Sequence, residues 1–300
     1  MLFDIAGILM NFKGMNDFFV ERCSSFIKEN DQSLLTEKID MDVSIEKVDH
    51  IKIPEGDLIL DESAKWLRKK DPEQGYFIYM HNRNTKMVAT TLEADPKWKS
   101  IKIQYIESDL PFPIKEQTEL IRWDDYRSFQ LAGITYRNHL LSRDSITIHS
   151  SAFAAGGKGV IISAPSGTGK STHARLWKEF YGDEVVFVND DRPAIRFLDH
   201  IPMLCGTPWS GSTDVYSNMK VPLNCIVMLE QSPINSIEQL EMERALQLLM
   251  PRCFLPYFDK ELMDMAIITL ENLIRAVPVY LLKCRPDYEA VELVWKCLNQ

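Results

Sequence analysis

One segment near the middle of the chain constrains the fold more than any other. An apolar run at Val160–Ser163 has the character of a buried strand, and His173–Phe180 has the spacing of a helix. Between them, residues 164–172 read Ala-Pro-Ser-Gly-Thr-Gly-Lys-Ser-Thr. A buried strand that passes through glycines into a helix is typical of an α/β sheet with a phosphate-binding loop. The segment therefore predicts an α/β domain with an anion site at this loop.

The loop matches most of the Walker A pattern G-x-x-x-x-G-K-[ST], although Ala164 replaces the first glycine. Glycines permit backbone angles that aim successive N–H groups at phosphate oxygens. Lys170 is expected to reach the β- and γ-phosphates of ATP, and Ser171 to bind Mg²⁺. A chance glycine-rich turn is the alternative, but the flanking strand and helix are the context that the motif requires. The residues predicted to bind the nucleotide are Ala164, Pro165, Ser166, Gly167, Thr168, Gly169, Lys170, Ser171 and Thr172.

A second acidic motif follows the next apolar run. Residues 184–188 read as a buried strand that ends in Asn189-Asp190-Asp191-Arg192. Carboxylates at the carboxyl end of such a strand hold Mg²⁺ in Walker B elements, and ligands of open α/β sheets bind at these strand ends. One carboxylate can bind the metal while the other accepts a proton from an attacking hydroxyl. A solvated turn is the alternative interpretation.

These motifs, together with His149 at the head of a strand, resemble the HPr kinase/phosphorylase family. That family shares its P-loop core with phosphoenolpyruvate carboxykinase, and the resemblance extends over roughly residues 145–285. It implies an α/β fold with a P-loop kinase core of the HPr kinase C-terminal type. Asp190 would be the proton acceptor, Asp191 would join Ser171 at the metal, and His149 would lie beside the transferred phosphate. Lys170 would keep its catalytic role in the loop.

The resemblance implies a Mg²⁺-dependent kinase that transfers the γ-phosphate of ATP to a hydroxyl. The segment that contacts the protein substrate in true HPr kinases cannot be matched in this sequence. The identity of the acceptor therefore stays open: a serine of a protein or peptide, or a small molecule. Two other functions stay open. One is a non-catalytic ATP-binding sensor or accessory protein, and the other is a carboxykinase-like enzyme, for which the chain is short.

Three further residues are candidates for substrate or phosphate contacts. Arg192 follows the acidic pair, Trp209 lies in the glycine-bounded loop 206–212, and Arg252 follows a proline between two predicted helices. The alternatives are a tryptophan packed on the core and an arginine that faces solvent.

The pattern along the chain predicts three parts. Residues 1–115 form a smaller, β-rich α+β module, residues 116–144 a connecting helix, and residues 145–300 the ATP-binding domain. Helices are expected at 16–28, 62–70, 116–141, 237–249, 261–274 and 288–297 by apolar periodicity. Residues 146–153 are expected to form one strand.

Composition limits the setting in which the protein works. The 300 residues carry a formal net charge of -9, which argues against non-specific binding to nucleic acid. None of the six cysteines has Cys-x-x-Cys spacing, so reduced thiols in the cytoplasm are expected. The N-terminus lacks the basic region of a signal peptide, and no apolar stretch has the length of a membrane span. A homo-oligomer is compatible with the sequence.

Overall fold

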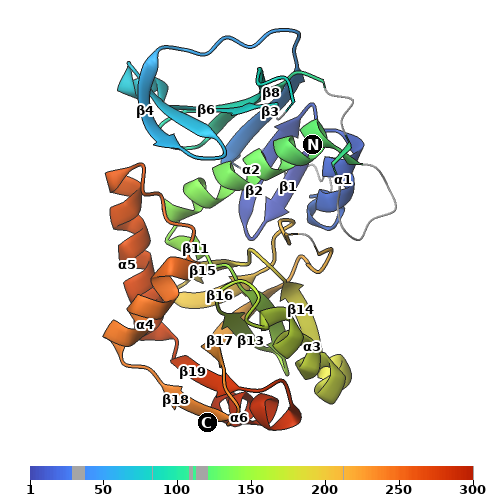
Figure 1. Ribbon diagram of the computed structural model, residues 1–300, viewed down its shortest axis with the longest axis vertical. Coiled ribbons are helices and arrows are strands. Elements are labelled where there is room, and N and C mark those ends of the chain that lie inside the picture. Colours follow the sequence, from blue (N-terminus) through green and yellow to red (C-terminus); the bar gives the residue numbers. More distant parts are fainter. Residues whose placement is uncertain (29–37, 83, 108–110, 113–120, 212, 300) are drawn as a thin grey trace. The chain divides into compact units, whose positions relative to one another are not determined.

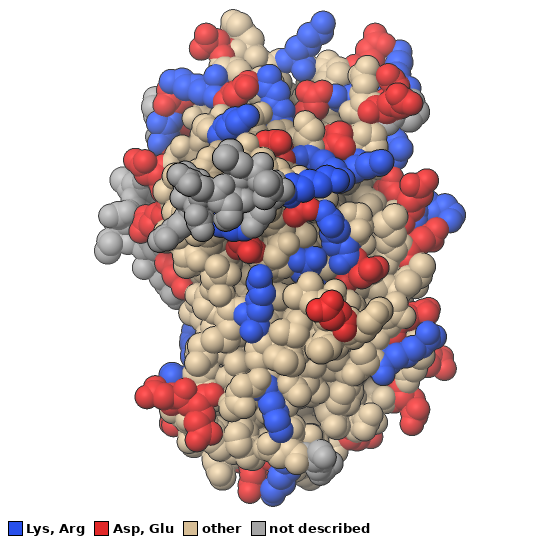
Figure 2. Space-filling model, turned by 180° about the vertical axis from the view of Figure 1, so that it is seen from behind, with Lys and Arg blue, Asp and Glu red and all other residues tan. Residues whose placement is uncertain are grey.

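The computed structural model describes residues 1–28, 38–82, 84–107, 111–112, 121–211 and 213–299. Within these residues the chain is mixed α/β and forms two compact units, Met1–His139 and Leu140–Gln300 (Figure 1). The division falls within the helix predicted as a connector. Lys and Arg side chains are interspersed with Asp and Glu over the face shown in Figure 2. In the described part of the chain, no helix is both long and apolar enough to cross a lipid bilayer.

The first unit is built on an eight-stranded sheet in the order β1-β2-β3-β8-β7-β6-β5-β4. Its strands are β1 (Leu2–Ile5), β2 (Ile8–Lys13), β3 (Met41–Lys47), β4 (Gly56–Asp61), β5 (Lys65–Lys69), β6 (Tyr76–His81), β7 (Val88–Ala94) and β8 (Ser100–Tyr105). Helix α1 (Asp17–Cys23) begins after Asn16, whose side chain accepts a hydrogen bond from the Phe19 amide at 2.8 Å. The remaining elements are the short strands β9 (Pro111–Phe112) and β10 (Ile121–Arg122), and helix α2 (Trp123–Leu141), whose last two residues are assigned to the second unit.

Two helix predictions in this unit need correction. The prediction of a helix at 62–70 is wrong, because residues 65–69 form β5 and pair with both β4 and β6. The periodicity of an apolar run this short does not distinguish a strand from a helix. The segment is a strand because it forms backbone hydrogen bonds with strands on both sides. The helix predicted at 116–141 begins at Trp123; residues 116–120 lie outside the described residues.

The second unit contains a nine-stranded sheet whose main path is β11-β15-β16-β17-β13-β12-β14, with β19 beside β17 and β18 beside β19. Its strands are β11 (Ser145–Thr147), β12 (Ser151–Ala155), β13 (Lys158–Ser163), β14 (Val185–Asn189), β15 (Ala194–Leu198), β16 (Ile201–Cys205), β17 (Lys220–Gln231), β18 (Ser236–Gln239) and β19 (Val279–Cys284). Its helices are α3 (Lys170–Tyr181), α4 (Met242–Leu249), α5 (Lys260–Ala276) and α6 (Tyr288–Leu298).

The direction of the strands decides where the motifs meet. β13, β17 and β19 are mutually parallel, and β12 is antiparallel to both β13 and β14. β14 therefore runs in the same direction as β13, although β12 separates them. The carboxyl ends of β13 and β14, which precede the glycine-rich loop and the acidic pair, consequently lie at one edge of the sheet. The first residue of β12 lies at the same edge.

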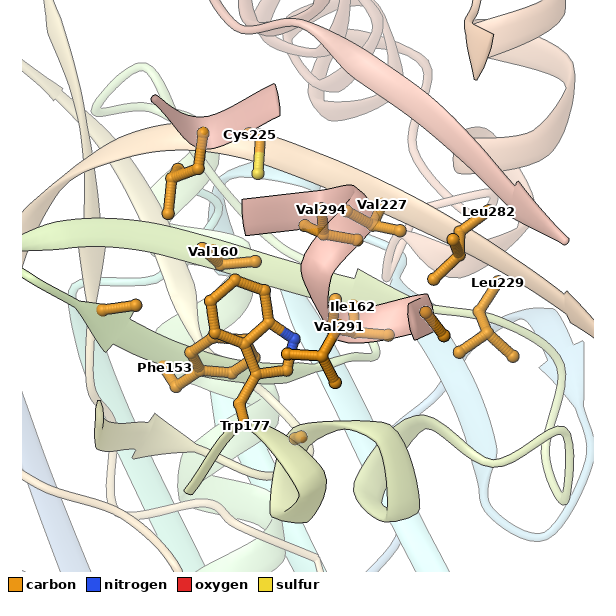
Figure 3. Close-up of a cluster of buried hydrophobic side chains, with 14 of the residues drawn as sticks. Phe153, Val160, Ile162, Trp177, Cys225, Val227, Leu229, Leu282, Val291 and Val294 are labelled. Atoms are coloured by element: carbon orange, nitrogen blue, oxygen red, sulfur yellow. The ribbon is translucent and has the colours of Figure 1, made fainter. Parts of the chain in front are cut away.

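A buried apolar cluster joins this sheet to α3 and α6 (Figure 3). Trp177 of α3 is fully buried, and its ring lies 4.9 Å from that of Phe153 on β12. Val291 and Val294 of α6 pack into the same cluster. Burial of apolar area at about 25 cal/mol per Å² is the main force that anchors α3, and with it the loop that precedes α3.

Two predictions in the second unit also need correction. The strand predicted at 146–153 is two strands, β11 and β12, that pair with different partners. The helix predicted at 237–249 begins only at Met242, because residues 236–239 form β18 against β19. In both segments, part of the predicted element pairs with a strand that is distant in the sequence, and this pairing divides the segment into two elements.

Candidate functional site

The turn between β13 and α3 has the backbone conformation that its glycines suggested. We call residues 164–169 the glycine loop. Gly167 and Gly169 have φ values of 78° and 111°, in the region that L side chains rarely adopt. Ala164 has no positive φ and is buried in the core cluster, so a methyl group is tolerated where the Walker A pattern has glycine. The Lys170 ammonium folds back on the loop, where it donates to the carbonyl oxygens of Ala164 at 3.1 Å and Pro165 at 3.4 Å.

A cavity of about 380 Å³ opens beside the glycine loop. The amino end of α3, where backbone N–H groups lack helical partners and the helix dipole is positive, contributes to its wall. Most of the residues predicted for the site meet here. They are His149, Ser166, Gly167, Gly169, Lys170, Ser171, Thr172, Asp190 and Asp191, joined by Ser210, Gly211 and Thr213.

The two adjacent aspartates have different surroundings. Asp190 Oδ1 accepts a hydrogen bond from Ser171 Oγ at 3.0 Å and another from Ser151 Oγ. Asp191 Oδ1 instead lies 3.8 Å from His149 Nδ1, and its Oδ2 lies 3.0 Å from Arg192 Nε. Asp190 is therefore the carboxylate beside Ser171 in the first turn of α3, and Asp191 is the one beside His149.

Burial and the surrounding charges shift the pKa values of His149 and Lys170. Burial lowers the pKa of His149; Asp191 opposes this shift, and the cations Lys170, Arg192 and Arg252 add to it. The pKa of Lys170 is also lowered, by burial and then by Arg252, while Asp191 and Asp190 act in the opposite direction. Lys170 and Arg252 repel each other, and an anion bound near both would relieve this repulsion.

The three further candidates lie in different places. The carbonyl of Arg252 accepts from the His149 amide at 2.8 Å, and its charge affects Lys170 and His149, but Arg252 does not line the cavity. Arg192 pairs with Asp191 and its guanidinium lies 5.5 Å from the centre of the Phe254 ring. Trp209 is buried, with 2% of its surface exposed, and the neighbouring Ser210 and Gly211 line the cavity instead.

Asn189, which the sequence marked only as part of the acidic turn, organises that turn. It is fully buried, and its side-chain oxygen accepts from the amides of Asp191 at 2.9 Å and Arg192 at 2.6 Å. Its Nδ2 donates to Thr207 O at 2.9 Å, which ties the acidic turn to the loop that follows β16. An asparagine directly after an apolar strand is the only sequence signal for this role.

A second cavity, of about 580 Å³, also borders the glycine loop. It shares Gly167, Gly169 and Thr172 with the first cavity. The ends of β17 and β19 supply its buried apolar residues, Leu229 and Cys284. The two cavities thus meet at the glycine loop, one with both aspartates and the other with an apolar wall.

The oxygen atoms near Ser171 suit Mg²⁺ bound jointly with phosphates. Among the described residues, no group of three or more His, Cys, Asp or Glu could hold a metal ion by itself. Mg²⁺, however, usually takes one or two protein oxygens and completes its shell with water and substrate phosphates. Ser171 Oγ and Asp190 Oδ1, 3.0 Å apart, are hard oxygen donors of the kind that this ion prefers.

Comparison with known proteins adds little to what the residues of the site indicate about function. No protein-family model matches the chain, and no curated protein matches it. Among solved structures, the HPr(Ser) kinase/phosphatase from Coxiella burnetii is similar at 12% sequence identity and a TM-score of 0.30, over 51% of this chain and 88% of that one. Similarity at this level leaves the function to be inferred from the residues of the site.

Proposed function

We propose that this chain is an ATP-dependent, Mg²⁺-requiring kinase that transfers the γ-phosphate to a hydroxyl of a protein, a peptide or a small molecule. The observation that carries the proposal is the hydrogen bond from Ser171 Oγ to Asp190 Oδ1 at 3.0 Å. Ser171 lies in the first turn of α3, which follows β13 and the glycine loop. This contact joins two residues 19 apart in the chain at one sheet edge, where they would form the two halves of a nucleotide-binding site.

The glycine loop and α3 would bind the phosphates. Loop amides and the helix amino end donate to phosphate oxygens, and Lys170 moves from its two carbonyl partners to the β- and γ-phosphates. Ser171 and Asp190 would hold Mg²⁺, which when bound neutralises charge on those phosphates. The 580 Å³ cavity, with its apolar wall at Leu229 and Cys284, would take the nucleoside.

Asp191 would then act on the acceptor. The acceptor oxygen forms a bond to the γ-phosphorus, the bond from that phosphorus to the β–γ bridging oxygen breaks, and ADP leaves. The hydroxyl proton goes to Asp191, the carboxylate beside His149. Arg252 and Lys170 supply positive charge next to the transferred group. This assignment exchanges the roles that the resemblance implied for Asp190 and Asp191, because Asp190 Oδ1 already accepts from two hydroxyls at the metal side.

Matched variants of the two aspartates test the proposal. Asp191→Asn should bind Mg-ATP normally and lose roughly 10²–10⁴-fold in kcat, the usual contribution of a general base. Asp190→Asn should instead raise the Mg²⁺ concentration that gives half-maximal activity. The assay follows label from γ-labelled ATP into a serine-containing peptide mixture and into water, with nucleotide affinity measured by calorimetry.

Three outcomes would change the conclusion. Wild-type protein that binds no ATP in the presence of Mg²⁺ would refute the kinase proposal. Binding of Mg-ATP without label transfer to any acceptor would indicate the ATP-binding sensor. Weakened Mg-ATP binding in Asp191→Asn, with normal binding in Asp190→Asn, would restore the original assignment of the pair.

A further inference from the structure

The strand order places an unexpected residue at the metal side of the site. In the sheet, β12 lies between β13, which leads into the glycine loop, and β14, which leads into the acidic turn. Because β12 is antiparallel to both, its first residue, Ser151, starts at the edge where these two strands end. The register puts Ser151 opposite Ile162 on one side and Ala152 opposite Asn189 on the other. Ser151 is thus next to the residue that follows Asn189, which is Asp190.

The Ser151 hydroxyl is buried and forms its hydrogen bond within this site. The residue is 1% exposed, so bulk water is not an alternative partner. Its Oγ donates to Asp190 Oδ1 and lies 3.3 Å from Ser171 Oγ. Ser171 Oγ reaches the same carboxylate oxygen at 3.0 Å. Two hydroxyls from separate elements therefore converge on one oxygen of Asp190.

We propose that Ser151 is a positioning residue for the Mg²⁺ site, which it serves by holding the Asp190 carboxylate in place beside Ser171. This inference rests on the proposed function. A hydrogen bond from a buried hydroxyl to a carboxylate restricts the rotation of that carboxylate. Groups that orient a metal ligand in this way typically contribute 10–100-fold to metal affinity.

The test is the affinity for Mg²⁺ of the protein–ADP complex, titrated by calorimetry so that no turnover is needed. Ser151→Ala should weaken Mg²⁺ binding by roughly 10–100-fold, while ADP binding without metal stays as in the wild type. Ser150→Ala is the matched control, because Ser150 is equally buried and its hydroxyl donates to Ile148 O at 3.1 Å instead of to Asp190. This control should bind Mg²⁺ with wild-type affinity.

A second variant separates positioning from folding. Ser151→Cys retains a side chain of similar size with a weaker donor, so its Mg²⁺ affinity should fall between those of the wild type and Ser151→Ala. Kinase assays at saturating Mg²⁺ should then restore near-normal kcat in both Ser151 variants.

The outcomes distinguish this inference from the proposed function. Equal Mg²⁺ affinity in Ser151→Ala, Ser150→Ala and wild type would overturn the role of Ser151 and leave the kinase proposal intact. A loss of kcat that saturating Mg²⁺ does not restore would also overturn it. If the wild-type ADP complex itself takes up no Mg²⁺, the proposed function fails, and the inference fails with it.

Discussion

Gly211 offers a sharp test of whether Asp191 takes part in the chemistry. Its φ of 68° is in the left-handed region, and a Cβ added there would lie 3.0 Å from both Cγ and Oδ2 of Asp191. Gly211→Ala therefore has two effects: backbone strain of about 1–2 kcal/mol, and displacement of the Asp191 carboxylate by a few tenths of an ångström. The strain should lower Tm by roughly 2–8 °C for a domain of this size.

The effect on activity should exceed what the loss of stability explains. Displacement of a catalytic group by about 1 Å can cost 10²-fold in rate, so we expect Gly211→Ala to lose several-fold to about 10²-fold in kcat. Gly157→Ala is the matched control, because Gly157 has a φ of 78° in the β12–β13 turn and an added Cβ there meets no atom within 4 Å. It should lose similar stability and no activity.

Thermal unfolding and turnover of γ-labelled ATP, measured on both glycine variants, separate an effect on Asp191 from a general loss of stability. If Gly211→Ala keeps wild-type kcat at temperatures where it is folded, Asp191 does not act in transfer. Equal loss of kcat in both variants would mean that general stability, and not the position of Asp191, limits the rate.

Further predictions concern the nucleotide and the response to acid. Lys170→Ala should weaken binding of ATP more than that of ADP in calorimetry, because its ammonium is expected to span the β- and γ-phosphates; an equal loss for both would contradict this. Pro286→Trp, at the lining of the 580 Å³ cavity, should weaken ATP and ADP alike, and unchanged affinities would place the nucleoside elsewhere. Burial lowers the pKa of His173 to about 4, below its ordinary value, because the folded protein favours the neutral imidazole. The resulting contribution to the free energy of unfolding, about 3 kcal/mol, is present above pH 6.5 and is lost as the pH falls towards 4. His173→Gln should flatten the dependence of urea-unfolding free energy on pH in this window, and an unchanged dependence would contradict the argument.

Local sequence was sufficient for the elements whose signal is contained in one stretch. The glycine loop was predictable because the backbone angles at Gly167 and Gly169, the apolar strand before them and the helix after them are encoded within about twenty residues. The long helices α5 and α6 were predictable for the same reason, since an apolar face repeats along each of them. Short apolar segments were not, as residues 65–69 show.

The sequence by itself thus determined that a glycine loop, a lysine, a serine and an acidic pair are present, each on a recognisable local element. Only the tertiary structure decided which aspartate faces which partner. Neighbouring residues at the end of a strand point in different directions, and the strand β12 that supplies Ser151 to Asp190 comes from 39 residues earlier in the chain. Likewise, Arg252 lies in a turn far along the chain, and only the fold brings it close to His149. Such contacts depend on sheet register and strand order, which long-range pairing sets and local residue patterns do not encode.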